Sequence, residues 1–163
     1  MSNLREGREL SAKAQRFQAV LDEYAPESRV VEFATPSRTA QQAADAIGCE
    51  LNQIVKSLLF RTDDDRPVLV LTAGGNRVDE QAIGRELGRD VSMADPAFVR
   101  EHTGYAIGGV PPFGHPQQVE TLIDEDLLAF DEIWAAAGTP NAVFPIRSER
   151  LLEITGGRRT RVS

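Results

Sequence analysis

The sequence predicts a mixed α/β fold of the α+β type, with a curved, mostly antiparallel or mixed sheet flanked by helices. Three observations lead to this class. Segments with helical and with strand periodicity alternate along the chain. Two apolar runs, 54–61 and 67–73, are joined by a charged turn, which is typical of an antiparallel hairpin. The order is not a regular βαβ repeat and neither GxGxxG nor a P-loop motif occurs, so Rossmann and P-loop folds are excluded.

Local start and stop signals predict the elements of the first half of the chain. Apolar side chains recur at helical spacing from residue 10, Ser11 is a favourable N-cap, and Pro26 stops the helix. Gly48 is placed as the C-cap of a second helix. We expect residues 1–28 to form an N-terminal helical segment. In order, the predicted elements are a helix over 10–24, a strand over 29–33, a helix over 39–47 and the hairpin strands 54–61 and 67–73.

The same signals continue through the second half. Gly88 ends a helix, Pro96 stands in the first turn of another, and Ser148 is expected to cap the last one, which Gly156 ends. The predicted elements are a helix over 79–87, a strand over 91–93, a helix from 95 to about 102, a strand over 119–123, an acidic turn or short helix over 124–128, strands over 133–136 and 142–146, a helix over 149–154 and a basic tail over 155–163.

The composition is that of an ordinary globular domain. The chain has 163 residues, of which 41% are hydrophobic and 26% charged, enough to bury a substantial core. We therefore expect one domain over residues 1–163. The apolar stretches are too short to span a membrane, and the N-terminus lacks the apolar run of a secretory signal. A cytoplasmic protein without a membrane partner is expected.

The net charge of −7 limits the partners. It argues against binding DNA or another long duplex through bulk electrostatics, but it leaves room for a small site that holds one end of a nucleic acid. Arginines near the C-terminus either contact phosphates or are simply solvated. They are Arg147, Arg150, Arg158, Arg159 and Arg161.

Few residues of the chain are typical metal ligands or nucleophiles. Cys49 is the single cysteine, and His102 and His115 are the two histidines, with no metal-ligand spacing between them. GxSxG, the motif that places the nucleophile of many serine hydrolases, is absent. We expect no metal and no cofactor. An enzyme with this inventory would work by positioning and electrostatics.

Two features could carry such chemistry. Lys56 stands inside the apolar run IVKSLLF, where an ammonium is costly to bury. It is either an outward-facing, solvated strand lysine or a positive charge directed into a pocket. The segment 103–116, TGYAIGGVPPFGHP, holds four Gly and three Pro and must be an irregular loop. It is either a rigid surface turn or a binding site made of backbone N–H groups.

Taken together, these motifs resemble one known family. The order IVKSLLF, LTAGGNRVDEQAIGRELG, TGYAIGGVPPFGH, VETLIDEDLL and AAGTPNAVFPI, from about residue 30 to 154, is similar to the YbaK/EbsC family. Its members are aminoacyl-tRNA deacylases related to the editing domain inserted in bacterial prolyl-tRNA synthetase. The resemblance implies a YbaK-like fold, hydrolysis of a mischarged amino acid from the tRNA 3′ end, and prolyl-tRNA synthetase as a possible partner protein.

The resemblance also implies roles for individual residues. Lys56 matches the signature lysine, which is thought to engage the terminal adenosine phosphate or the ester region. Gly108 and Pro112 take the defining places of the Gly-x-x-x-Pro loop, associated with binding the ester carbonyl and aligning water; this chain has Pro111 where relatives often have Ser or Thr. Substrate-binding positions are implied for Gly74, Gly75, Asn76, Gly109, Val110, Pro111, Phe113, Gly114, His115, Ala137 and Gly138.

The expected function is therefore a free-standing, trans-acting deacylase of mischarged aminoacyl-tRNA, with tRNA(Pro) as the carrier. An aminoacyl ester on a ribose is already activated, so backbone donors and one ammonium can supply the remaining charge stabilisation. A neighbouring ribose hydroxyl can align the attacking water. The alternatives are a binding module of the same fold that recognises aminoacyl-tRNA or a nucleotide without hydrolysis, and a small-molecule hydrolase or protein-interaction domain.

Overall fold

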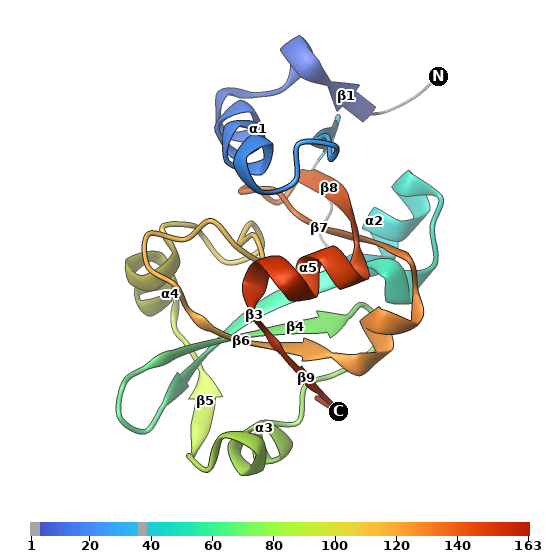
Figure 1. Ribbon diagram of the computed structural model, residues 1–163. Coiled ribbons are helices and arrows are strands. Elements are labelled where there is room, and N and C mark those ends of the chain that lie inside the picture. Colours follow the sequence, from blue (N-terminus) through green and yellow to red (C-terminus); the bar gives the residue numbers. More distant parts are fainter. Residues whose placement is uncertain (1–3, 36–38) are drawn as a thin grey trace.

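The computed structural model describes residues 4–35 and 39–163, and it confirms the mixed α/β class (Figure 1). Residues 1–3, the start of the expected N-terminal segment, and 36–38 lie outside the described residues. The strands form two sheets. The first sheet has the order β1 (Leu4–Glu6), β2 (Val31–Phe33), β8 (Ala142–Arg147) and β7 (Glu132–Ala136), all antiparallel. The second has the order β5 (Val91–Met93), β3 (Val55–Thr62), β4 (Pro67–Ala73), β6 (Glu120–Asp124) and β9 (Arg158–Thr160).

The second sheet is mixed in direction. The expected hairpin is present, because residues 55–61 of β3 pair antiparallel with residues 67–73 of β4, and β5 pairs antiparallel with β3. The pairs β4–β6 and β6–β9 are parallel. The two sheets meet where β3 begins, through an isolated parallel bridge between Ile54 and Trp134 on β7. The single curved sheet that the sequence suggested is thus divided in two and joined at this bridge.

Except at the start of the last helix, the helices begin and end at the expected caps or within one or two residues of them. The side chains of Ser11, Thr39, Asp79 and Asp95 accept backbone N–H groups at four N-termini, and Gly48, Gly88, Gly104 and Gly156 end helices in the left-handed conformation. The helices are α1 (Ala12–Tyr24), α2 (Ala40–Ile47), α3 (Glu80–Leu87), α4 (Pro96–Thr103) and α5 (Ser148–Thr155). None of the helices in the described ranges is long and apolar enough to cross a membrane.

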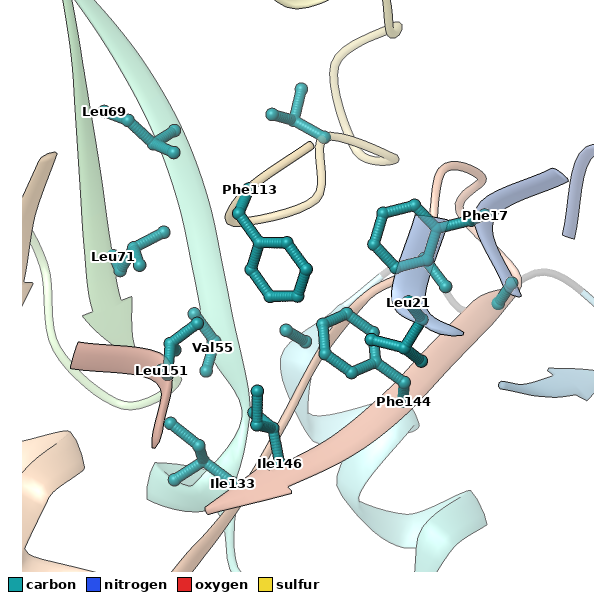
Figure 2. Close-up of a cluster of buried hydrophobic side chains, with 14 of the residues drawn as sticks. Phe17, Leu21, Val55, Leu69, Leu71, Phe113, Ile133, Phe144, Ile146 and Leu151 are labelled. Carbon is teal, nitrogen blue, oxygen red and sulfur yellow. The ribbon is translucent and has the colours of Figure 1, made fainter. Parts of the chain in front are cut away.

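The main hydrophobic core lies between the two sheets, and the Gly/Pro loop contributes to it. Figure 2 shows Phe113, from the loop, placed between the rings of Phe17 and Phe144 and the strand residues Val55 and Leu71. The ring centroids of Phe113 and Phe144 are 5.7 Å apart and those of Phe17 and Phe113 are 6.0 Å apart. Because α1, the loop and β8 each supply one of these rings, the core fixes all three relative to one another.

Three expectations about the ends of the chain need correction. Before the first helix the chain forms β1 and a short 3-10 turn, because β1 pairs with β2. The basic tail is not simply solvated, since β9 pairs with β6 and Val162 is fully buried. Ser148 is not a cap but the first residue of α5: it is buried, and its hydroxyl donates to the carbonyl of Phe130.

Candidate functional site

Lys56 lies near the start of β3, opposite Thr72 on β4, and its side chain is half-buried. Its Nζ donates a hydrogen bond to the backbone oxygen of Asn76 at 2.7 Å. Burial lowers the pKa of the ammonium, while the negative charge of Asp124 acts in the opposite direction. Lys56 is therefore not a freely solvated strand lysine. Its charge is held at a defined point of the sheet in partly desolvated surroundings.

The turn after β4, which contains the carbonyl that accepts from Lys56, packs against Leu51 and Asn52. The N–H of Gly75 donates to Asn52 Oδ1 at 2.8 Å. A Cβ on Gly74 would lie 2.4 Å from the backbone oxygen of Leu51, a separation that packed atoms do not reach. This close approach of backbone to backbone is the reason for glycine at position 74. The structure thus brings Lys56, Gly74, Gly75 and Asn76 together.

A buried carboxylate, which the sequence analysis missed, organises this turn. Asp124 ends β6 and is 1% exposed. Its Oδ2 accepts from Thr72 Oγ1 at 3.1 Å, Ala73 N at 2.9 Å and Asn76 Nδ2 at 2.9 Å, and its Oδ1 accepts from Asp126 N at 3.0 Å. The sequence predicts a helix start at this acidic run, and Asp124 Oδ1 does cap the 3-10 helix Glu125–Ala129. The role of Oδ2 in holding the turn is not predicted, and an acid that directly follows a buried apolar strand is the available signal.

The Gly108–Pro112 loop is fixed against the turn after β7. Gly108 is exposed, with a φ of +92°, whereas Gly109, Val110, Pro111 and Pro112 are buried. A Cβ on Gly109 would lie 2.9 Å from the Cα of Thr139 and 3.0 Å from the carbonyl carbon and oxygen of Gly138. The loop and the Ala137–Gly138 turn, both of them among the implied substrate-binding positions, are therefore in contact.

The loop keeps few backbone donors for a ligand. Pro111 and Pro112 have no N–H, and the N–H of Gly109 already donates to the backbone oxygen of Ala106 at 3.0 Å. The N–H groups of Gly108 and Val110 have no acceptor in the described part of the chain. These two groups are the donors that the loop can offer to an oxygen atom of a ligand.

His115 contacts the loop through a hydrogen bond to its backbone. Its Nε2 lies 2.7 Å from the backbone oxygen of Pro111, and because a carbonyl only accepts, this ring nitrogen carries the proton. Burial lowers the pKa of the imidazole, and the hydrogen bond to Pro111 opposes that shift. Gly114 beside it has a φ of +82° and lies against Val20 of α1. Phe113 and Gly114 thus tie the loop to the core and to α1.

The two groups of candidate residues lie on neighbouring strands. The parallel bridge between Ile54 and Trp134 sets the start of β3 beside β7, so Lys56 and Ala136 are each two residues beyond it. No hydrogen bond joins the Lys56 group to the loop within the described ranges. Next to Lys56, Ser57 turns to the opposite face of β3, and its buried hydroxyl has no partner in the part of the chain that is described.

The remaining candidates differ in their surroundings. Arg150 pairs with Glu153 and Arg158 with Glu86, so two of the five C-terminal arginines are engaged within the protein. Cys49 is partly buried, and burial raises the pKa of its thiol. Over residues 4–35 and 39–163, no group of three or more His, Cys, Asp or Glu side chains could hold a metal ion.

Comparison with known proteins gives consistent matches. The family model described as "Aminoacyl-tRNA editing domain" matches residues 34–154. The Bacillus subtilis protein "Uncharacterized protein YwhH" is 36% identical over 129 residues, which are 79% of this chain and 82% of the relative. The Enterococcus faecalis protein "Putative Cys-tRNA(Pro)/Cys-tRNA(Cys) deacylase EbsC" is 26% identical over 121 residues, 74% of each chain. A solved structure described as "Crystal structure of a putative trans-editing enzyme for prolyl tRNA synthetase" matches with a TM-score of 0.90 and 42% identity, over 95% of this chain and 99% of the other.

The environment of His115 predicts a pH dependence of stability. Because the folded-state pKa lies below the unfolded value near 6.5, the unfolded chain takes up the proton first as the pH falls. The stability associated with the neutral imidazole is fully present above about pH 6.5 and is lost as the pH falls through the lower folded pKa. Urea midpoints at about pH 7.5 and about 5.5 measure this loss.

His115→Gln keeps a side-chain donor for Pro111 but does not titrate, so we expect a smaller difference between the two midpoints. His102→Gln removes the second histidine of the chain, which lies on α4. It should leave the difference between the two urea midpoints as in the wild type. An unchanged pH dependence in the His115→Gln protein would show that this histidine does not control it.

Proposed function

Because this chain belongs to the aminoacyl-tRNA editing domain family, we propose that it hydrolyses mischarged aminoacyl-tRNA in trans, with tRNA(Pro) as the carrier. The observation that carries the proposal is the fixed Gly108–Pro112 loop, whose Gly108 and Val110 N–H groups have no acceptor in the described part of the chain. The carrier is supported by the description of the solved relative, which names prolyl-tRNA synthetase, and by the name of the Enterococcus protein, which includes Cys-tRNA(Pro).

The proposed reaction is ester hydrolysis at the tRNA 3′ end. The oxygen of a water molecule attacks the ester carbonyl carbon, the bond from that carbon to the ribose oxygen breaks, and the ribose oxygen takes the proton. The products are the free amino acid and tRNA with a 3′-terminal hydroxyl. The neighbouring ribose hydroxyl aligns the water, so no side-chain base is required.

The chain would supply electrostatic stabilisation and positioning. The N–H groups of Gly108 and Val110 donate to the carbonyl oxygen as it gains negative charge, and the buried prolines keep these donors in place. The Lys56 ammonium holds the terminal phosphate or the ester region as a compact charge. Pro112 fixes the end of the loop. The turns 74–76 and 137–138 line the two sides of the bound 3′ end.

We further propose that residues 1–163 act as one editing domain in the cytoplasm, with prolyl-tRNA synthetase as a partner protein. The single-domain proposal is supported by the main core, which contains residues from Leu10 on the N-terminal side to Leu151 on α5 and draws on both sheets. The net charge of −7 suits recognition of one end of a tRNA better than binding along a duplex.

The function is tested by release of radiolabelled amino acid from a panel of mischarged tRNAs. We expect release from mischarged tRNA(Pro) and no release from correctly charged Pro-tRNA(Pro). Binding of the panel without release would favour a recognition module of the same fold. Hydrolysis of small esters with no effect on any tRNA would favour a small-molecule hydrolase.

Lys56 gives the first mutational prediction. Lys56→Ala should lower the deacylation rate about 100-fold, because a preorganised charge is removed from the reacting region. Lys56→Arg should restore little, since a planar guanidinium does not replace a compact ammonium in a confined place. Lys13→Ala, at an exposed position of α1, is the matched lysine control and should keep wild-type activity. A folded, active Lys56→Ala protein would remove this residue from the mechanism.

Gly108 gives the second mutational prediction. Its φ of +92° means that Gly108→Ala forces an alanine into the left-handed region, at a cost of about 1–2 kcal/mol of stability. Gly48, with a φ of +86° and no atom within 4 Å of an added Cβ, is the matched control at the end of α2. Urea midpoints should fall similarly in both variants, but deacylation should fall about 100-fold only in Gly108→Ala. Equal activity in the two proteins would exclude the loop from catalysis.

A further inference from the structure

We propose that Asp124 is a positioning residue for Lys56 and acts through Asn76. The inference rests on the proposed function, because it concerns the lysine that this function uses. Asp124 would not touch the substrate. It would set where the ammonium is presented, by holding the turn whose carbonyl oxygen the ammonium contacts.

The first step is the environment of the carboxylate. Asp124 is 1% exposed and has no hydrogen bond to a cation among the described residues. A buried carboxylate of this kind is stable only when its oxygens accept enough hydrogen bonds. Three donors converge on Oδ2, from Thr72, Ala73 and Asn76. Two of these donors belong to the end of β4 and the third to the turn that follows it.

The second step is the two-ended role of Asn76. Its side-chain amide donates to Asp124 Oδ2 at 2.9 Å and to Asp126 Oδ2 at 2.7 Å. Its backbone N–H donates to the carbonyl of Ala73 at 2.9 Å, and its backbone oxygen accepts from Lys56 Nζ at 2.7 Å. A residue held at both its side chain and its N–H has little freedom to rotate. The carbonyl that receives Lys56 is therefore oriented by Asp124.

The third step is charge. Asp124 is the carboxylate whose negative charge acts on Lys56 across the sheet, and it favours the protonated amine against the opposing effect of burial. Asp126 is exposed and accepts one side-chain hydrogen bond from Asn76. The two acids share the Asn76 amide but differ in burial and in the number of donors, which makes Asp126 a matched control.

The experiment uses the two lysines of the chain as reporters. In protein labelled with ¹³C- and ¹⁵N-lysine, Lys56 and the exposed Lys13 give two side-chain signals, and Lys13 is the internal reference. Asp124→Asn removes the negative charge. It also replaces one accepting oxygen by an NH₂ group, which cannot accept a hydrogen bond from the donor that faces it. We expect the Lys56 pKa to fall further below its wild-type value and the exchange of its ammonium protons with water to quicken. Asp126→Asn should leave both properties near wild type.

Deacylation is measured on the same proteins. We expect kcat to fall about 10- to 100-fold in Asp124→Asn with little change in KM, because a displaced charge weakens the reacting geometry more than binding. Asp126→Asn should stay within about twofold of wild type. Asn76→Ala, which removes both amide bonds but keeps the Asp124 charge, should also quicken the exchange of the Lys56 protons. It provides the same test if Asp124→Asn does not fold.

The outcomes separate this inference from the proposed function. An unchanged Lys56 signal and unchanged kcat in a folded Asp124→Asn or Asn76→Ala protein would overturn the inference. If the wild-type protein releases no amino acid from any tRNA but the Lys56 signal responds as expected, the positioning by Asp124 stands and the proposed function fails.

Discussion

The packing of Phe113 into the core between the two sheets is the interaction on which the position of the Gly108–Pro112 loop depends. Its ring is 5% exposed and lies against Phe17 of α1 and Phe144 of β8 (Figure 2). A loop rich in Gly and Pro has no hydrogen-bonded ladder of its own, so a buried aromatic side chain is what gives it a fixed place. Once Phe113 is buried, the preceding residues must pass close to the Gly138–Thr139 turn. The glycine at position 109 permits that approach.

The second constraint is electrostatic. A half-buried ammonium in a protein of net charge −7 is stabilised here by one carbonyl contact and by the field of a buried carboxylate that it does not touch. That arrangement leaves the charge of Lys56 in place without neutralising it in an ion pair. The backbone N–H groups of Gly108 and Val110 on the loop add partial positive charges to the full charge of Lys56. The candidate site therefore combines one positioned charge with fixed backbone donors, which suits stabilisation of a developing oxyanion.

Much of the fold follows from the sequence because its signals are local. The caps at Ser11 and Asp95, the C-terminal glycines at 48 and 88, and the hairpin around residues 62–66 each involve residues within a few positions of one another. Of the candidate site, Lys56 and the Gly108–Pro112 segment could be recognised in the same way. Each breaks the pattern around it: a charge within an apolar strand, and a segment without any period.

What the tertiary structure alone decided involves partners that are far apart in the chain. The sequence does not predict the strands at 4–6 and 158–160, and each exists because a distant strand offers it an edge. The role of Ser148 changed because its hydroxyl meets the carbonyl of Phe130 rather than its own helix. Asp124 caps a short helix as the sequence predicts, but its bonds to the end of β4 and the turn after it are not predictable, because those donors lie about fifty residues earlier. The sequence by itself determined the α-helices of the described chain, its strands other than those at 4–6 and 158–160, and which residues carry charge or lack a side chain. Only folding decided which of these meet, because hydrogen bonds and burial depend on distances in space that sequence spacing does not specify.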